Sequence, residues 1–208
     1  MNTAIGLIAA SLLTGALALF AASMMLGAPP LSFASSLVIS WAYVAFASAV
    51  AAEAPLDRQA AALAGIAFAA MYSGLNTVVY FVQLTTVAQA SASAEIVQAL
   101  SFNELGSLMF NLDLLGYGLM SISTLFVGLA LQPANAGDRV LRLLLIVHAV
   151  FAPVCVLLPV LNVFGSMPRA GGNSFGILVL LSWCAYFAPI GVLSVRHFAI
   201  RRPRLQPT

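Results

Sequence analysis

The chain has 208 residues, of which 62% are hydrophobic and only 7% are charged. Soluble domains carry about 25% charged residues, so this chain has too few polar side chains to cover a surface in water. The composition predicts an integral membrane protein and excludes a disordered chain, a coiled coil and a nucleic-acid-binding protein. All eight basic residues are arginine, which also excludes lysine-based Schiff-base chemistry and therefore a retinal protein.

Six apolar stretches reach the length of about 20 residues that a membrane-spanning helix needs. They cover approximately residues 4–26, 33–52, 60–84, 105–131, 140–163 and 174–198, separated by segments rich in Gly, Pro, Asn and charged residues. The predicted fold is all-α: a polytopic six-helix transmembrane bundle in a single domain, residues 1–208. We expect the protein to be embedded in a lipid bilayer. The two hypotheses for its protein partners are a homo-oligomer and a larger membrane complex.

The arginines indicate how the bundle is oriented. Six spans place both termini on one side, and seven arginines fall on that side: Arg58, Arg139, Arg142, Arg196, Arg201, Arg202 and Arg204. Only Arg169 falls on the opposite side. Connections rich in arginine stay in the cytoplasm, so we expect both termini to be cytoplasmic.

The longest connection, residues 89–103, joins the third and fourth spans. It begins with polar residues and then places Ile96, Val97, Leu100 and Phe102 between two glutamates. This spacing suits a short helix in the membrane interface, and a plain loop fits equally well.

The fourth span divides into an apolar face and a polar face. The polar face carries Asp113, Tyr117, Ser121 and Thr124. The apolar residues that fall within about 100° of arc on the opposite side are Leu108, Leu112, Leu115, Leu119, Ile122, Phe126 and Leu129. An ionised aspartate near the centre of a span costs about 2.5–3.5 kcal/mol. Asp113 is the only acidic residue that we expect to be buried, and it should face the bundle.

The third span has a polar stripe that should meet Asp113. Its members are Tyr72, Asn76, Tyr80, Gln83 and Thr86, which lie within about 120° of arc. Lipid does not accommodate two carboxamides on one face, so the stripe should contact another helix or water. Asn76 and Gln83 lie at the depth where Asp113 enters from the next, antiparallel span.

The fifth span carries His148 on a face with Cys155, and Pro153 and Pro159 should kink it. In the first span, Ser11 and Gly15, like Ala18 and Ala22, have the four-residue spacing that allows close helix packing.

Two segments resemble parts of uncharacterised bacterial multi-pass inner-membrane proteins. They are Asn76-Thr77-Val78-Val79-Tyr80-Phe81-Val82-Gln83-Leu84 and Asp113-Leu114-Leu115-Gly116-Tyr117-Gly118-Leu119-Met120-Ser121. The resemblance implies a bacterial inner-membrane location and brings no activity, cofactor or residue role.

The sequence leaves three functional hypotheses. The first is a polar intramembrane pocket that binds or passes a small polar ligand or protons. Its candidate residues are Asp113, Tyr117, Asn76, Tyr80, Gln83 and His148, each of which also has a structural interpretation as a hydrogen-bonded core residue. The second is a structural or accessory subunit of a larger membrane complex. The third, an intramembrane enzyme, is disfavoured because no metal-binding, phosphate-binding or nucleophile–base motif is found, and no cofactor is indicated.

Overall fold

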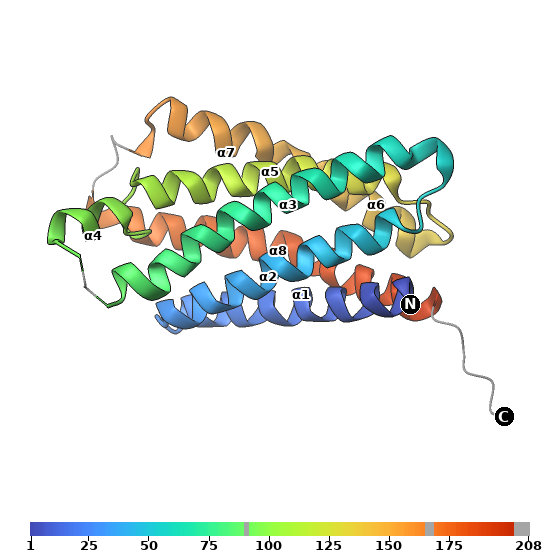
Figure 1. Cartoon of the computed structure of the whole chain (residues 1–208), viewed down its shortest axis with the longest axis horizontal. Helices are drawn as coiled ribbons and strands as arrows, with labels where there is room; N and C mark the ends of the chain where they lie inside the picture. The colour runs from blue at the N-terminus through green and yellow to red at the C-terminus, as the bar shows by residue number, and fades with distance from the viewer. Residues whose placement is uncertain (90–91, 165–168, 202–208) are drawn as a thin grey trace.

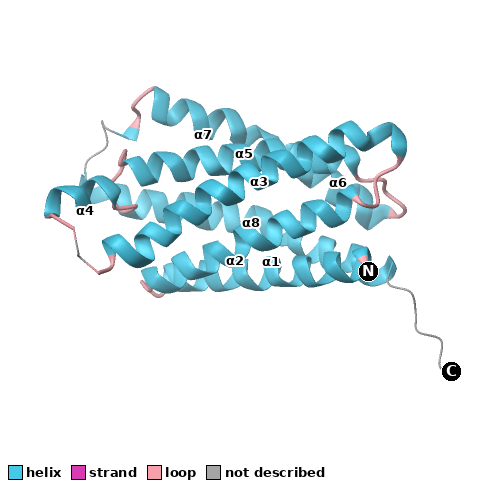
Figure 2. Ribbon diagram, viewed as in Figure 1, coloured by secondary structure: helices cyan, strands magenta, loops and turns pink. Residues whose placement is uncertain are grey.

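The computed structural model describes residues 1–89, 92–164 and 169–201, and side chains 169–175 lie outside that description. Within these ranges the chain is helical and forms no strand (Figure 2). Six helices, two of them interrupted by a local turn, are long and apolar enough to cross a membrane. The predicted all-α bundle with six spans is therefore confirmed.

The helices follow one another with short connections, except between the third and fourth spans. In chain order they are α1 (Asn2–Met25), α2 (Pro29–Ala51), α3 (Gln59–Val82), α4 (Ala94–Leu100), α5 (Leu108–Ala130), α6 (Ala136–Val147), α7 (Phe151–Val160) and α8 (Arg169–Arg201). A 3₁₀ turn, Leu56–Arg58, precedes α3, and a π-helical turn, Gln83–Val87, extends it. The 3₁₀ turn His148–Val150 joins α6 to α7 within the fifth span.

The spans form a closed ring at one end of the molecule. Neighbours pack in the order α1, α2, α3, α5 and α6, and α8 closes the ring by packing against both α6 and α1. The N-terminus and the end of α8 lie together at this closed end, with the α2–α3 and α5–α6 connections (Figure 1). The opposite end holds the α1–α2 turn, α4 and the start of α8.

The α1–α2 turn shows how the sequence sets one of these connections. Gly27 has a φ of +63°, which is favourable for glycine, and Pro29 begins α2 at a position that needs no amide donor. The hydroxyls of Ser23 and Ser32 are hydrogen-bonded across the turn at 2.8 Å. The two helices are therefore tied together directly at this end.

The two predicted faces of the fourth span are confirmed in α5. Asp113, Tyr117, Ser121 and Thr124 are buried, whereas none of the residues on the apolar arc is. At mid-bundle the Tyr43 hydroxyl donates to Ser123 Oγ at 2.9 Å, and Ser123 donates to the Gly65 carbonyl at 2.7 Å. This chain of bonds joins α2, α5 and α3.

The packing face of α1 differs from the prediction. Ser11, Gly15, Ala18 and Ala22 are exposed. The close approach is made instead by Gly6, which faces the ring of Phe198 in α8, and by Thr14, which faces Gly191. Because almost every residue of α1 is apolar or small, its sequence has no polar stripe that distinguishes the inner face.

The fifth span bends where the sequence predicts a kink. Pro153 has no amide to donate to the Ala149 carbonyl, and the helix is interrupted at His148–Val150, just before it. Below the bend α6 packs on both α5 and α8, and above it α7 packs on α5. Because of the bend, α7 packs less closely on α8 than α6 does.

The long connection contains the short helix α4, one of the two predicted alternatives. The Ser93 hydroxyl caps it by accepting from the Ile96 amide. Gln83 holds the connection to α3: its amide donates to the Leu100 carbonyl at 2.9 Å, and its oxygen accepts from the Phe102 amide at 2.8 Å.

Candidate functional site: an apolar cavity lined by Asp113

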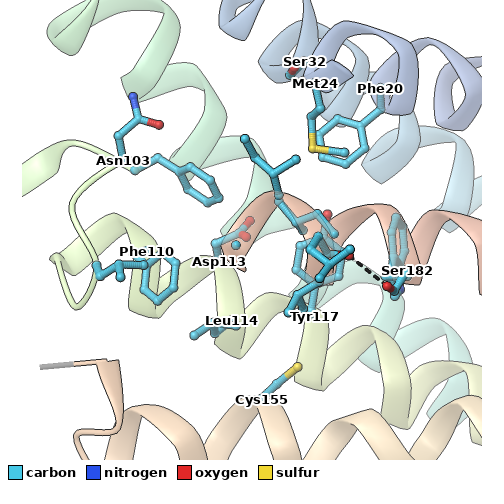
Figure 3. A pocket seen from close by; sticks show the side chains of 18 of the residues that line it. Phe20, Met24, Ser32, Asn103, Phe110, Asp113, Leu114, Tyr117, Cys155 and Ser182 are labelled. Carbon is cyan, nitrogen blue, oxygen red and sulfur yellow. Dashed lines mark hydrogen bonds between the residues drawn. The ribbon is translucent and has the colours of Figure 1, made fainter. Parts of the chain in front are cut away.

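A cavity of about 840 Å³ lies at the end of the bundle away from the termini. Its wall is formed by the α1–α2 turn, the connection before α5, one face of α5, α7 and the first half of α8, with Tyr80 from α3. The volume is within the range of about 300–1,000 Å³ that is typical of small-molecule sites. Figure 3 shows Asp113 and Tyr117 projecting from α5 into this space, with Phe20 and Met24 across from them.

Asp113 is the only charged residue in the described wall of this cavity. Its side chain is 3% exposed. Asn76 Nδ2 donates to it over a long distance of 3.4 Å, and the Tyr80 hydroxyl approaches it as a second donor outside ordinary hydrogen-bond geometry. No basic side chain among the described residues forms an ion pair with it. Buried carboxyl groups normally have several hydrogen-bond partners or a counter-ion, so Asp113 is poorly satisfied by the protein itself.

Asn76 reaches Asp113 because Gly116 leaves room for it. A methyl group at Gly116 would collide with Asn76 Oδ1. Gly116 lies one helical turn after Asp113, so the same face of α5 presents the acid and the space for its partner. The contact between the α3 stripe and Asp113 expected from the sequence is thus present through Asn76.

Two tyrosines complete the polar part of the site. Tyr80 and Tyr117 both line the cavity and interact electrostatically with Asp113 and with each other. Tyr80 is 1% exposed, and its hydroxyl approaches Asp113 and Tyr117 without a hydrogen bond of ordinary geometry to either. A buried hydroxyl whose partners are poorly placed is costly, so a ligand atom would be favourable here.

The rest of the wall is apolar and rich in aromatic rings. Phe102 packs on Tyr80 with ring centroids 6.1 Å apart, and Phe110 packs on Phe102 at 5.9 Å. On the α8 side, Trp183 meets Tyr117 edge-on at 5.0 Å. The cavity therefore combines one acidic group and a few hydroxyls with a large hydrophobic surface.

The two remaining candidate residues lie away from the cavity. Gln83 uses both ends of its carboxamide to hold the α4 connection, as described above. His148 lies at the bend of the fifth span, where Trp183 Nε1 donates to its Nε2 at 3.0 Å and its Nδ1 lies 2.9 Å from Thr124 Oγ1. Because an indole only donates, Nε2 accepts and Nδ1 carries the proton that bonds to Thr124. His148 is thus a fully hydrogen-bonded core residue.

A second polar cluster, at the closed end, was missed by the sequence analysis. His197 Nδ1 lies 2.9 Å from Asp138 Oδ1, and its Nε2 lies 3.2 Å from Glu53 Oε2. Arg201 forms ion pairs with Glu53 and, at 3.3 Å, with Asp138. We call these four residues the closed-end cluster; it joins the α2–α3 connection, α6 and α8.

The expectation that Asp113 is the only buried acid is therefore wrong. Asp138 is also 3% exposed, because its carboxylate accepts from the Ala134 amide at 3.0 Å and meets His197. One signal for the cluster was available: His197 and Arg201 are four residues apart, which places them on one helix face. The span count also puts that face on the same side as Glu53 and Asp138.

The closed-end cluster shifts the ionisation of Glu53. Burial alone raises the pKa of this carboxyl, but its hydrogen bonds and charge interactions with His197 and Arg201 outweigh burial and hold the pKa below the ordinary value. Glu53 is thus stabilised in its ionised form.

The described arginines gather at the closed end. Arg58 donates to the Leu131 carbonyl at 2.9 Å, and Arg201 donates to the Gln132 carbonyl at 3.1 Å, so both cap the end of the fourth span. Arg139, Arg142 and Arg196 belong to the same end through α6 and α8. Arg202 and Arg204, and the side chain of Arg169, lie outside the described residues.

Comparison of the chain with protein-family models, with curated proteins and with solved structures finds no match.

Proposed function

We propose that this membrane protein binds a small molecule inside its helix bundle, in the cavity that Asp113 lines. The observation that carries the proposal is the state of this acid. It is buried in the wall of a cavity large enough for a ligand, its hydrogen bond from Asn76 is long, and no described basic residue pairs with it. Ionisable groups inside a membrane are costly, and they commonly serve binding or proton transfer.

The wall of the cavity refines the ligand expected from the sequence. A small polar ligand would leave most of the aromatic and aliphatic surface unused. A ligand with an apolar body would bury that surface and place its polar group at Asp113, where Tyr80 adds a hydroxyl. Proton binding at Asp113 is compatible with the same geometry.

We also propose that the protein lies in a bacterial inner membrane with both termini in the cytoplasm. Support comes from the arginines at the closed end, which is the end that carries the termini. Under this orientation the cavity lies in the outer half of the bilayer, on the side of the α1–α2 turn.

Asp113→Asn tests the proposal with little change in shape. Native mass spectrometry of protein extracted from its membrane in mild detergent should show a small-molecule adduct on the wild type that is absent from the variant. Asp57→Asn is the matched control, since Asp57 is exposed at the closed end, and it should keep the adduct. Equal melting temperatures of the three proteins would show that folding is intact.

Two results would contradict the proposal. One is the same adducts on wild type and on Asp113→Asn. The other is no adduct on either protein together with an unchanged pH dependence of Trp183 fluorescence, measured in Trp41→Phe protein. If extraction instead recovered a stable heterologous complex whose formation is insensitive to Asp113→Asn, the accessory-subunit hypothesis would be favoured.

A further inference from the structure

We propose that the cavity takes an amphiphile from the bilayer: a molecule with a long apolar body and a cationic amine head that binds at Asp113. This inference rests on the proposed function and specifies the class of its ligand. It is carried by the charge of the site, by the aromatic rings around it and by the position of the opening.

The charge of the site favours a cation. Asp113 is the one charged group in the described wall, and no described basic residue neutralises it. A carboxylate in a low-dielectric cavity is stabilised most by a donor that is itself charged. An ammonium group provides three donors and no acceptor, which matches the two carboxylate oxygens and the nearby phenol oxygen of Tyr80. The same charge disfavours fatty acids and other anionic amphiphiles.

The rings beside Asp113 also suit a cation. Tyr80, Phe110, Tyr117 and Trp183 all line the cavity. The face of an aromatic ring attracts an ammonium group, by about 0.5–2 kcal/mol depending on burial. The wall also has aliphatic members, among them Leu114, Val154 and Leu158, and these offer a surface that an alkyl chain would cover.

The opening faces the direction from which an amphiphile would come. Val154 of α7 and Ile177, Leu178 and Val179 of α8 line the cavity, yet each is at least 40% exposed. They lie on α7 and α8, which pack on α5 and on α1 more closely than on each other within the described residues, so we infer that the cavity opens between α7 and α8 through an apolar rim. A molecule dissolved in the bilayer can pass this rim without first entering water.

The test uses three probes and the full chain in nanodiscs of zwitterionic lipid. Dodecylammonium has both tail and charge, dodecanol has the tail without the charge, and ethylammonium has the charge with almost no tail. Binding is measured by the fluorescence of Trp183 in Trp41→Phe protein and by native mass spectrometry. Dodecylammonium should bind at least about tenfold more tightly than dodecanol, as expected for one charge-assisted hydrogen bond. Ethylammonium should not bind measurably.

Asp113→Asn should abolish the preference for dodecylammonium and leave dodecanol binding within about twofold, because the shape of the cavity is kept. Equal affinities for dodecylammonium and dodecanol in the wild type would overturn the amine head while leaving binding in the cavity intact. If neither long-chain probe changed Trp183 but the native adduct still depended on Asp113, the ligand class would be wrong and the proposed function would stand. If the Asp113-dependent adduct were also absent, both the ligand class and the proposed function would be refuted.

A pair of variants in α8 tests whether the ligand enters between α7 and α8. Ser182 lines the cavity at the rim, and Ala185 is exposed one turn farther along α8 outside the described wall. Ser182→Phe should slow association of dodecylammonium about tenfold or more by narrowing the rim, while Ala185→Phe should leave the rate unchanged. Equal association rates in the two variants would contradict lateral access between α7 and α8.

Discussion

Gly116 determines how closely Asn76 can approach Asp113. Gly116→Ala places a methyl group against Asn76 Oδ1 and should destabilise the protein by about 1–3 kcal/mol, the usual cost of overpacking. Gly74→Ala is the control, since no atom lies within 4 Å of the added group; its effect should stay within about 1 kcal/mol in either direction. Denaturation of the two variants in detergent measures the difference, and equal stabilities would show that the contact is unimportant.

Glu53 gives the closed-end cluster a dependence on pH. The pKa of Glu53 is lower in the folded protein than its ordinary value of 4.5, so the folded state binds protons less readily than the unfolded state. Its stabilising effect is therefore complete above that value and is lost as the pH falls below it. The melting temperature of the wild type should therefore decrease as the pH falls below about 5.

Glu53→Gln should flatten this part of the pH profile. Some slope will remain, because His197, Arg201 and Asp138 still face one another in the cluster. Glu95→Gln, at an exposed position of α4, should reproduce the wild-type profile. A Glu53→Gln profile as steep as that of the wild type would contradict the role given to Glu53.

At the scale of the element, we expect the bend of the fifth span to set the distance between α7 and α8. Pro153→Ala restores an amide that can donate to the Ala149 carbonyl, so the span should straighten and α7 should continue along α8 as α6 does. Spin labels at Val156→Cys and Leu178→Cys, in protein carrying Cys155→Ala and Cys184→Ala, should then move closer together.

Pro159→Ala is the matched control for this measurement. Pro159 lies beyond the labelled position, so its replacement should leave the distance between the labels unchanged. An unchanged distance in Pro153→Ala would mean that packing on α5, and not the proline, directs α7.

Elements whose sequences alternate between polar and apolar faces were predicted well. Both faces of α5 and the stripe of α3 follow from residue types alone, because lipid tolerates polar groups poorly. The inner face of α1 did not follow, since its residues are nearly uniform in polarity. The closed-end cluster did not follow either, because Glu53, Asp138 and His197 are far apart in the chain and only the packing of three helix ends brings them together.

For the whole molecule, the orientation remains a prediction with a direct test. A green fluorescent protein fused after the C-terminus should fluoresce in a bacterial host, since it matures in the cytoplasm. Alkaline phosphatase inserted in the connection at 101–107 should be active, since it requires the periplasm. The opposite pair of results would invert the proposed topology and place the cavity in the inner half of the membrane.

The ion pairs among the described residues and the cavity lie toward opposite ends of the bundle, so the two can be altered separately. Substitutions in the closed-end cluster should change the free energy of unfolding without touching the wall of the cavity. Substitutions at the rim of α7 and α8 should change binding without removing an ion pair. The protein is thus suited to engineering in which thermal stability is increased at one end while ligand preference is varied at the other.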